Sequence, residues 1–172
     1  MMAPQTIPGE MFAITYGCLV VELIKDYENV DEVNAQLDKM GFNIGLRIAD
    51  DFLSKNINVG KCTDMKQLSE VLAKTALKTY LGVTGQVTSW SSSGDECSII
   101  IDGNPLTEFV EIPDKYVGLK YSQIICGAIR GALEAMHMDV IIVLVEDVPN
   151  PTEIRLKFNR IIRENVPAGE DE

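Results

Sequence analysis

The spacing of apolar residues changes once along this chain, and that change limits the possible folds more than any other feature. From Met11 to Leu81, apolar residues recur every three or four positions, which is the period of amphipathic helices. After Gln86 come short runs rich in Ile and Val, and Ile154 and Leu156 alternate with polar neighbours as in a half-buried strand. The chain therefore predicts helices first and paired strands afterwards.

Cap and turn residues divide this pattern into elements. Asp31 is a candidate N-cap for the second helix, Thr63 or Asp64 for the third, and Gly82 and Gly85 follow the third helix as breakers. Hairpin-like strand pairs predict an α+β fold with helices packed on a four-stranded antiparallel sheet. We expect helices over residues 11–27, 31–56, 65–81 and 118–138, and strands over 86–90, 96–102, 139–148 and 152–162.

A single domain is expected over residues 10–164, between a loose lead-in over 1–9 and a flexible acidic tail over 165–172.

The formal net charge of −11 argues against nucleic acid as a partner, because phosphate binding requires a basic face. We see no signal peptide and no apolar stretch of the ~18 residues that a membrane span requires. The four cysteines form no C-x-x-C pair, which favours reduced thiols in the cytosol.

Few residues suggest catalysis. His137 is the one histidine, and the sequence places no nucleophile or haem pocket beside it, so a structural or solvent-facing role is favoured over a ligand or a base. Neither a P-loop nor a G-x-G-x-x-G motif occurs. Adjacent carboxylates such as Asp50 and Asp51 indicate solvated charge. These observations predict a binding or assembly protein that is not an enzyme.

Cys62 is the most reactive candidate. It follows Gly60 and Lys61 at the expected start of a helix, where the positive end of the helix dipole and the lysine both favour a thiolate. Such a thiolate could be acylated or oxidised. The alternative is an inert cysteine that fills an apolar gap, and the residues alone favour that alternative.

Two glycine pairs are spaced four residues apart within predicted helices, Gly41 with Gly45 and Gly127 with Gly131. A glycine costs a helix about 1 kcal/mol relative to alanine, so four of them indicate a close backbone approach. Tight helix packing, a subunit interface and space for an inserted chain all remain open. A membrane site does not fit, because neither helix is apolar on all sides.

Six segments together resemble the TRAPP subunit 3 family, the small BET-type subunits of the trafficking protein particle complex. That complex is a vesicle-tethering and exchange-factor assembly of the early secretory pathway. The resemblance implies a fold of helices on a four-stranded antiparallel sheet, which is also the fold of the nitric-oxide-signalling and Golgi-transport ligand-binding proteins. The segments are EMFAITYG at 10–17, KDYENVDEVNAQLDKMGFNIGLRIADDFL at 25–53, VGKC at 59–62, SIIIDGNPLTEFVEIPD at 98–114, IICGAIRGALEAM at 124–136 and NVPAGEDE at 165–172.

The resemblance gives Cys62 a role. The family cysteine that accepts a palmitoyl group matches Cys62. In the family, the acyl chain lies in an apolar tunnel inside the protein. Lys61 stands where the family usually has arginine, which keeps the charge but loses the fork-like hydrogen bonding. Palmitate, as a covalent thioester or a bound fatty acyl chain, is therefore the implied cofactor.

The resemblance also implies partners. Family members dimerise through helical surfaces, with themselves or with related small subunits, and lie in the cytoplasm at cis-Golgi and ER-derived membranes. Their C-terminal tail takes part in nucleotide exchange on a Rab/Ypt GTPase, an activity expected only of the assembled complex. An acidic tail could compete for Mg²⁺ near the nucleotide, whereas the alternative is an uninvolved terminus. The matching residues are Asn165, Val166, Pro167, Ala168, Gly169, Glu170 and Asp171.

Three rival functions remain. A soluble fatty-acid or lipid carrier, or another small-ligand sensor of this fold, would use the same tunnel without a thioester. A haem sensor would use His137 as its ligand. A cysteine-dependent enzyme would need Cys62 within hydrogen-bond distance of His137.

Overall fold

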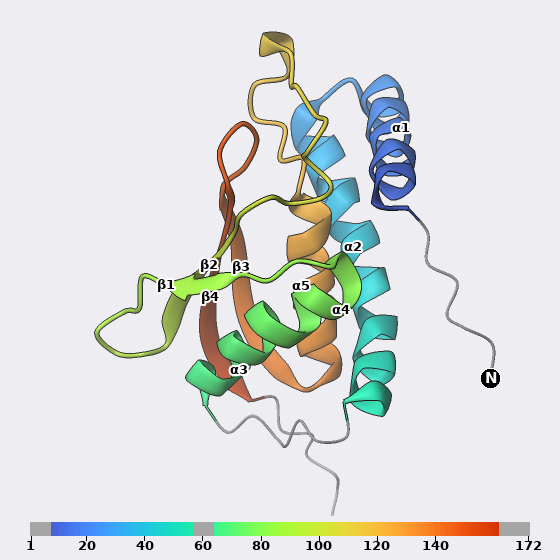
Figure 1. The fold of residues 1–172 in the computed structure, drawn as a ribbon. Helices are drawn as coiled ribbons and strands as arrows, with labels where there is room; N and C mark the ends of the chain where they lie inside the picture. Colours follow the sequence, from blue (N-terminus) through green and yellow to red (C-terminus); the bar gives the residue numbers. More distant parts are fainter. Residues whose placement is uncertain (1–7, 57–63, 162–172) are drawn as a thin grey trace, which may run out of the picture.

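A computed structural model gives the structure of the protein and describes residues 8–56 and 64–161. It is an α+β structure in which helices cover one face of a sheet, as the sequence predicts (Figure 1). The helices are α1 (Gly9–Tyr27), α2 (Val30–Lys55), α3 (Met65–Val71), α4 (Leu77–Leu81) and α5 (Gln123–Ala135), and the strands are β1 (Gln86–Thr88), β2 (Glu96–Ile101), β3 (Met138–Glu146) and β4 (Thr152–Ile161).

The sheet has four strands in the order β1-β2-β4-β3, and each neighbouring pair is antiparallel. The two predicted hairpins are thus joined through β2 and β4, where Ile99 lies opposite Ile154. Ile154 and Leu156 are fully buried, while Arg155 and Lys157 between and after them are exposed. This alternation confirms the two-residue period read from the sequence.

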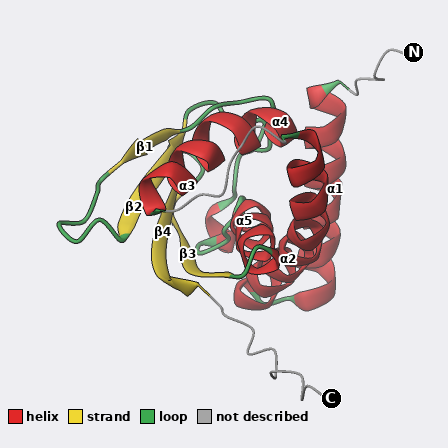
Figure 2. Ribbon diagram, turned by 90° about the horizontal axis from the view of Figure 1, so that it is seen from below, coloured by secondary structure: helices red, strands yellow, loops and turns green. Residues whose placement is uncertain are grey.

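Helix α5 lies between the sheet and α2, and α1 packs on α2 further out (Figure 2). The paired glycines make this arrangement possible. A Cβ atom on Gly41 would lie 2.1 Å from the Ile124 carbonyl oxygen, and one on Gly127 would lie 2.2 Å from the Asp38 carbonyl oxygen. Gly45 and Gly131 are equally close to the facing helix. Of the three roles left open for these glycines, close helix packing within the chain is the one observed.

The predicted cap of α2 is wrong by two residues. Asn29, not Asp31, is the N-cap, because Asn29 has extended backbone angles and its side chain accepts a hydrogen bond from the Asp31 backbone N–H at 2.9 Å. Asp31 instead lies in the first turn, where its charge interacts favourably with the helix dipole. Helices α1 and α2 are joined by a short turn and form an αα-hairpin.

The third predicted helix has the expected ends but a different middle. Asp64 caps it through the Gln67 backbone N–H, and Gly82 ends it with a left-handed φ of 75°. Between α3 and α4, however, residues 72–76 form a wider π-helical turn, the π segment. There the Ala73 carbonyl accepts a hydrogen bond from the Gly85 backbone N–H at 2.8 Å, outside the helix. Such turns often occur at functional sites.

The fourth predicted helix, over residues 118–138, is wrong at both ends, since α5 begins at Gln123 and ends at Ala135. Before it, the Ser122 backbone N–H and hydroxyl both donate to the Asp147 carboxylate at 2.7 Å, which ties this residue to the turn after β3. After it, His137 has a left-handed φ of 60°, and Met138 already belongs to β3. Within the described ranges, no helix is both long and apolar enough to cross a membrane.

Candidate functional site

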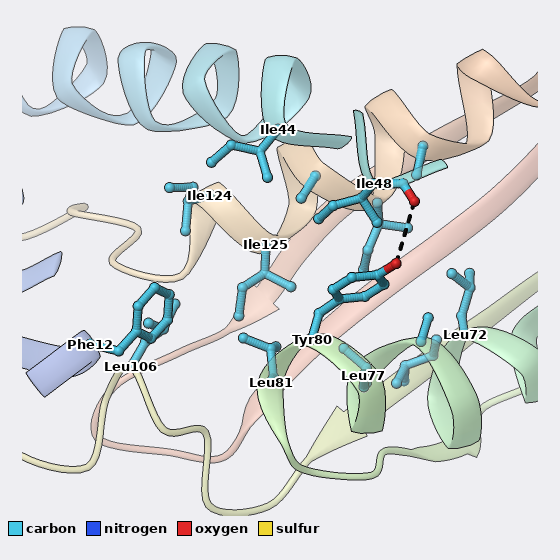
Figure 3. Close-up of a pocket in the computed structure, with 15 residues that line it drawn as sticks. Phe12, Ile44, Ile48, Leu72, Leu77, Tyr80, Leu81, Leu106, Ile124 and Ile125 are labelled. Carbon is cyan, nitrogen blue, oxygen red and sulfur yellow. Dashed lines mark hydrogen bonds between the residues drawn. The ribbon is translucent and has the colours of Figure 1, made fainter. Parts of the chain in front are cut away.

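A cavity of about 250 Å³ lies between α2 and α5 on one side and α4 with the π segment on the other (Figure 3). One residue of α1, one of β2 and one of the loop before α5 complete its wall. The lining residues are almost all apolar: Phe12, Ile44, Ile48, Leu72, Ala76, Leu77, Tyr80, Leu81, Ile99, Leu106, Ile124, Ile125, Ala128, Ile129 and Ala132.

This lining decides what the cavity can hold. Tyr80 is the one residue among those fifteen with a polar side chain. A buried water needs two to four polar partners, and an engineered apolar cavity of roughly 150 Å³ stays dry and binds benzene. The cavity is therefore suited to a larger apolar ligand.

Small side chains create the space. Ala128 and Ala132 line the cavity from α5, and each directly follows one of the glycines that pack against α2. Across from them, Ala76 ends the π segment. One face of α5 thus packs tightly on α2 while the adjacent face leaves room for a ligand.

The cavity reaches the surface near α1 and α2. Phe12 and Ile44 both line it, yet they are 51% and 45% exposed. Large apolar side chains that are this exposed at the edge of an apolar cavity mark a binding site, in contrast to an ordinary protein surface.

Tyr80 makes a polar contact at the edge of the cavity. The Tyr80 hydroxyl donates a hydrogen bond to the Asp51 carboxylate at 2.7 Å, and Lys55 Nζ donates to the same oxygen at 2.7 Å. The hydrogen bonds from Lys55 and then Tyr80 lower the pKa of Asp51. Burial, followed by the bond to Asp51, raises the pKa of Tyr80. At neutral pH the phenol is therefore protonated and the carboxylate is charged.

The sequence-predicted functional residues fall largely outside the described ranges. This applies to Cys62 and Lys61 and to the tail over residues 165–171. His137 is exposed in the turn between α5 and β3 and does not line the cavity, a position that favours the solvent-facing interpretation. Within the described part of the chain, no three His, Cys, Asp or Glu side chains are grouped to hold a metal ion.

Two other cysteines, Cys97 and Cys126, do not have the reactive character proposed for Cys62. Cys97 and Cys126 are buried, and burial raises the pKa of both thiols, that of Cys126 to about 12. Both thiols are therefore protonated at neutral pH and serve as small apolar groups. Cys18 is exposed on α1.

The lining residues were not identified from the sequence, although a signal for them exists. In CGAIRGALEA, each glycine of the packing pair is followed by an alanine at the same four-residue spacing. Two stripes of small residues on one helix indicate two different close contacts. One is with a neighbouring helix, and the other is with a group that is not part of the chain. The second stripe is the cavity wall.

Comparison with known proteins assigns the family. The model of the transport protein particle (TRAPP) component family matches residues 12–159. The chain belongs to the TRAPP component family. A trafficking protein particle complex subunit 3 homologue from Caenorhabditis briggsae is 50% identical over 166 residues, covering 95% of this chain and 91% of the relative.

Solved structures agree with the TRAPP assignment. Trafficking protein particle complex subunit 3 from Naegleria fowleri, in a crystal structure covalently bound to palmitic acid, is 44% identical with a TM-score of 0.84, covering 91% of this chain and 98% of that chain. A mutant of the H-NOX protein of T. tengcongensis matches with a TM-score of 0.53 at 12% identity, covering 95% of this chain and 81% of that one. The second likeness concerns the fold alone, and it confirms the fold class expected from the sequence.

Proposed function

We propose that this chain is a core subunit of the TRAPP vesicle-tethering complex in ER-to-Golgi transport, holding a palmitoyl chain attached at Cys62. It works from the cytoplasm at cis-Golgi and ER-derived membranes. The observation that carries the proposal is the apolar cavity, in a chain whose relative from Naegleria fowleri binds palmitic acid covalently. The chain itself catalyses no reaction.

The cavity favours an acyl chain over a polar ligand. Burying a methylene group contributes about 0.8 kcal/mol, so even a partly enclosed acyl chain stabilises the folded protein by several kcal/mol. An acyl chain held inside the protein is not available to anchor it in a bilayer. Its role is then structural, and contact with membranes comes through the assembly.

A soluble lipid carrier is the second candidate, because an apolar cavity also suits a reversible ligand. Intact mass spectrometry before and after hydroxylamine distinguishes the two functions. A thioester at Cys62 survives denaturation and is cleaved by hydroxylamine, whereas a reversible ligand is lost on denaturation alone.

The partners are other small TRAPP subunits or a second copy of this chain, bound through α1. That helix buries one stripe, which includes Tyr16 and Val20, but carries a second apolar stripe on its outer side. Ile14 is 64% exposed and Val21 50% exposed there, together with Met11. An exposed apolar stripe of this kind marks an association surface.

Placing a charge on the outer stripe should prevent assembly without unfolding the chain. We expect Ile14→Asp and Val21→Asp to lose co-purification with other small TRAPP subunits, because a carboxylate would be buried without a partner. Size-exclusion chromatography with light scattering after co-expression measures this effect. Val117→Asp is the matched control, since Val117 is 83% exposed in the loop before α5 and is not part of the α1 stripe. Equal loss in all three variants would contradict the role of α1.

The tail is proposed to act in nucleotide exchange on a Rab/Ypt GTPase by the assembled complex. Removing residues 165–172 should slow exchange by the reconstituted complex by roughly tenfold, the effect of losing about 1.4 kcal/mol of barrier stabilisation. Release of a fluorescent GDP analogue measures the rate, and neutralising only Glu170 and Asp171 tests the charge. Strong exchange by the isolated chain would contradict the assignment of exchange to the assembly.

A further inference from the structure

The cavity separates α4 from α2, and Tyr80 reaches across it. In the part of the chain that the structure describes, these two helices make little direct contact with each other. The Tyr80 ring extends from α4 along the cavity wall toward α2, with its hydroxyl pointing to the α2 backbone (Figure 3). Tyr80 therefore closes the wall at a place where the helices themselves do not.

The Tyr80 hydroxyl, which is the end of the side chain farthest from α4, is held by hydrogen bonds to α2. It lies 2.7 Å from Asp51 Oδ2 and 3.5 Å from the Ile48 carbonyl oxygen, both on α2. Lys55, one turn later on α2, holds the same Asp51 oxygen at 2.7 Å. A hydrogen bond from a neutral phenol to an ionised carboxylate is charge-assisted and stronger than a bond between neutral groups.

Six other lining residues are far less free to move than Tyr80. Leu72, Leu77 and Ile99 are buried members of the main hydrophobic core, and so are the lining residues Leu106, Ile125 and Ile129. Moving any of them opens the core. Tyr80 is only partly buried, and Asp51 has 41% of its side chain exposed. The ring can thus swing outward once the bond to Asp51 breaks.

We propose that Tyr80 is the gate of the acyl cavity, and that its hydrogen bond to Asp51 is the latch that slows entry and exit of a long acyl chain. The proposal rests on the proposed acyl-binding function and adds a residue that controls the rate. Asp51 is a positioning residue here, because it does not line the cavity and acts on the ligand only through the Tyr80 ring.

Stopped-flow release of cis-parinaric acid, a fluorescent long-chain fatty acid, tests the latch. The full chain carries Cys62→Ser so that no thioester forms, and the loaded protein is mixed with excess phosphatidylcholine vesicles. We expect Tyr80→Phe and Asp51→Ala each to speed release roughly tenfold, as for the loss of a hydrogen bond to a charged group. The double variant should be no faster than either single variant, and Kd should change much less than the rate.

Tyr16→Phe is the matched control. Tyr16 is buried and its hydroxyl donates to the Tyr121 carbonyl oxygen, but it does not line the cavity. This variant loses a buried tyrosine hydrogen bond and should release the probe at the parental rate. Faster release in Tyr16→Phe as well would mean that general loss of stability, not the latch, sets the rate.

The possible outcomes distinguish failure of the latch from failure of the proposed acyl-binding function. Normal binding with an unchanged release rate in both Tyr80→Phe and Asp51→Ala would overturn the latch and leave the acyl cavity in place. Failure of the Cys62→Ser parent to bind the probe at all would overturn both proposals. Additive acceleration in the double variant would overturn the claim that the two residues act as one unit.

Discussion

Replacing Gly41 with alanine should destabilise the protein by at least about 3 kcal/mol, at the upper end of the cost of overpacking. The added Cβ would lie 2.1 Å from the Ile124 carbonyl oxygen and 2.9 Å from the Ala128 backbone nitrogen. Both are backbone atoms of α5, so no side-chain rotation relieves the clash. Helices α2 and α5 must separate, which also moves the cavity wall that Ala128 forms. The midpoint and slope of urea unfolding measure the loss.

Gly17 provides the matched control for this result. It lies within α1, and the nearest atom to an added Cβ is the Tyr121 hydroxyl oxygen at 3.4 Å, an ordinary contact. Gly17→Ala should therefore stabilise the protein by about 0.5–1 kcal/mol, since alanine favours helix over glycine. The same substitution thus has opposite signs in two helices. Similar unfolding midpoints for the two variants would show that α2 and α5 are not as close as described.

Filling the cavity should abolish acylation at Cys62. Ala76 lines the cavity from the π segment, away from the contact between α2 and α5, so Ala76→Leu adds bulk there without separating those helices. In the parent protein, removal of the acyl chain with hydroxylamine should lower stability by several kcal/mol. In Ala76→Leu the acylated fraction should fall close to zero, and hydroxylamine should leave stability unchanged.

The control for the filled cavity is Ala135→Leu. Ala135 is exposed at the end of α5 and does not line the cavity, so this variant should be acylated like the parent. Intact mass spectrometry measures the acylated fraction, and thermal unfolding measures stability with and without hydroxylamine. Full acylation of Ala76→Leu with the parental gain in stability would place the acyl chain elsewhere.

Much of the fold could be predicted from the sequence because its signals are local. The Asp64 cap, the Gly82 break and the alternation along β4 each act within a few residues. The α2 cap error was a local choice between Asn29 and Asp31, but the other errors arose where distant contacts decide the local structure. The true start of α5 depends on Asp147, 25 residues after Ser122, and at the π segment the Ala73 carbonyl accepts a hydrogen bond from the Gly85 backbone N–H beyond the end of α4.

The candidate site was only partly predictable for the same reason. Cys62 could be named because the glycine and lysine before it, and the resemblance of its segment, are visible in the chain. The cavity is formed by residues from six separate regions of the chain, and their convergence follows from tertiary packing alone. Tyr80 in particular has the helical spacing of an ordinary core residue. Its contact with Asp51 joins positions 29 residues apart.

A crystal structure of the full chain purified from eukaryotic cells would show whether Cys62 carries an acyl chain inside the cavity. We predict continuous tubular density that starts at Cys62 Sγ and fills the cavity between α2, α4 and α5. A free Cys62 thiol beside an empty cavity, or a ligand in the cavity without a bond to Cys62, would contradict this prediction.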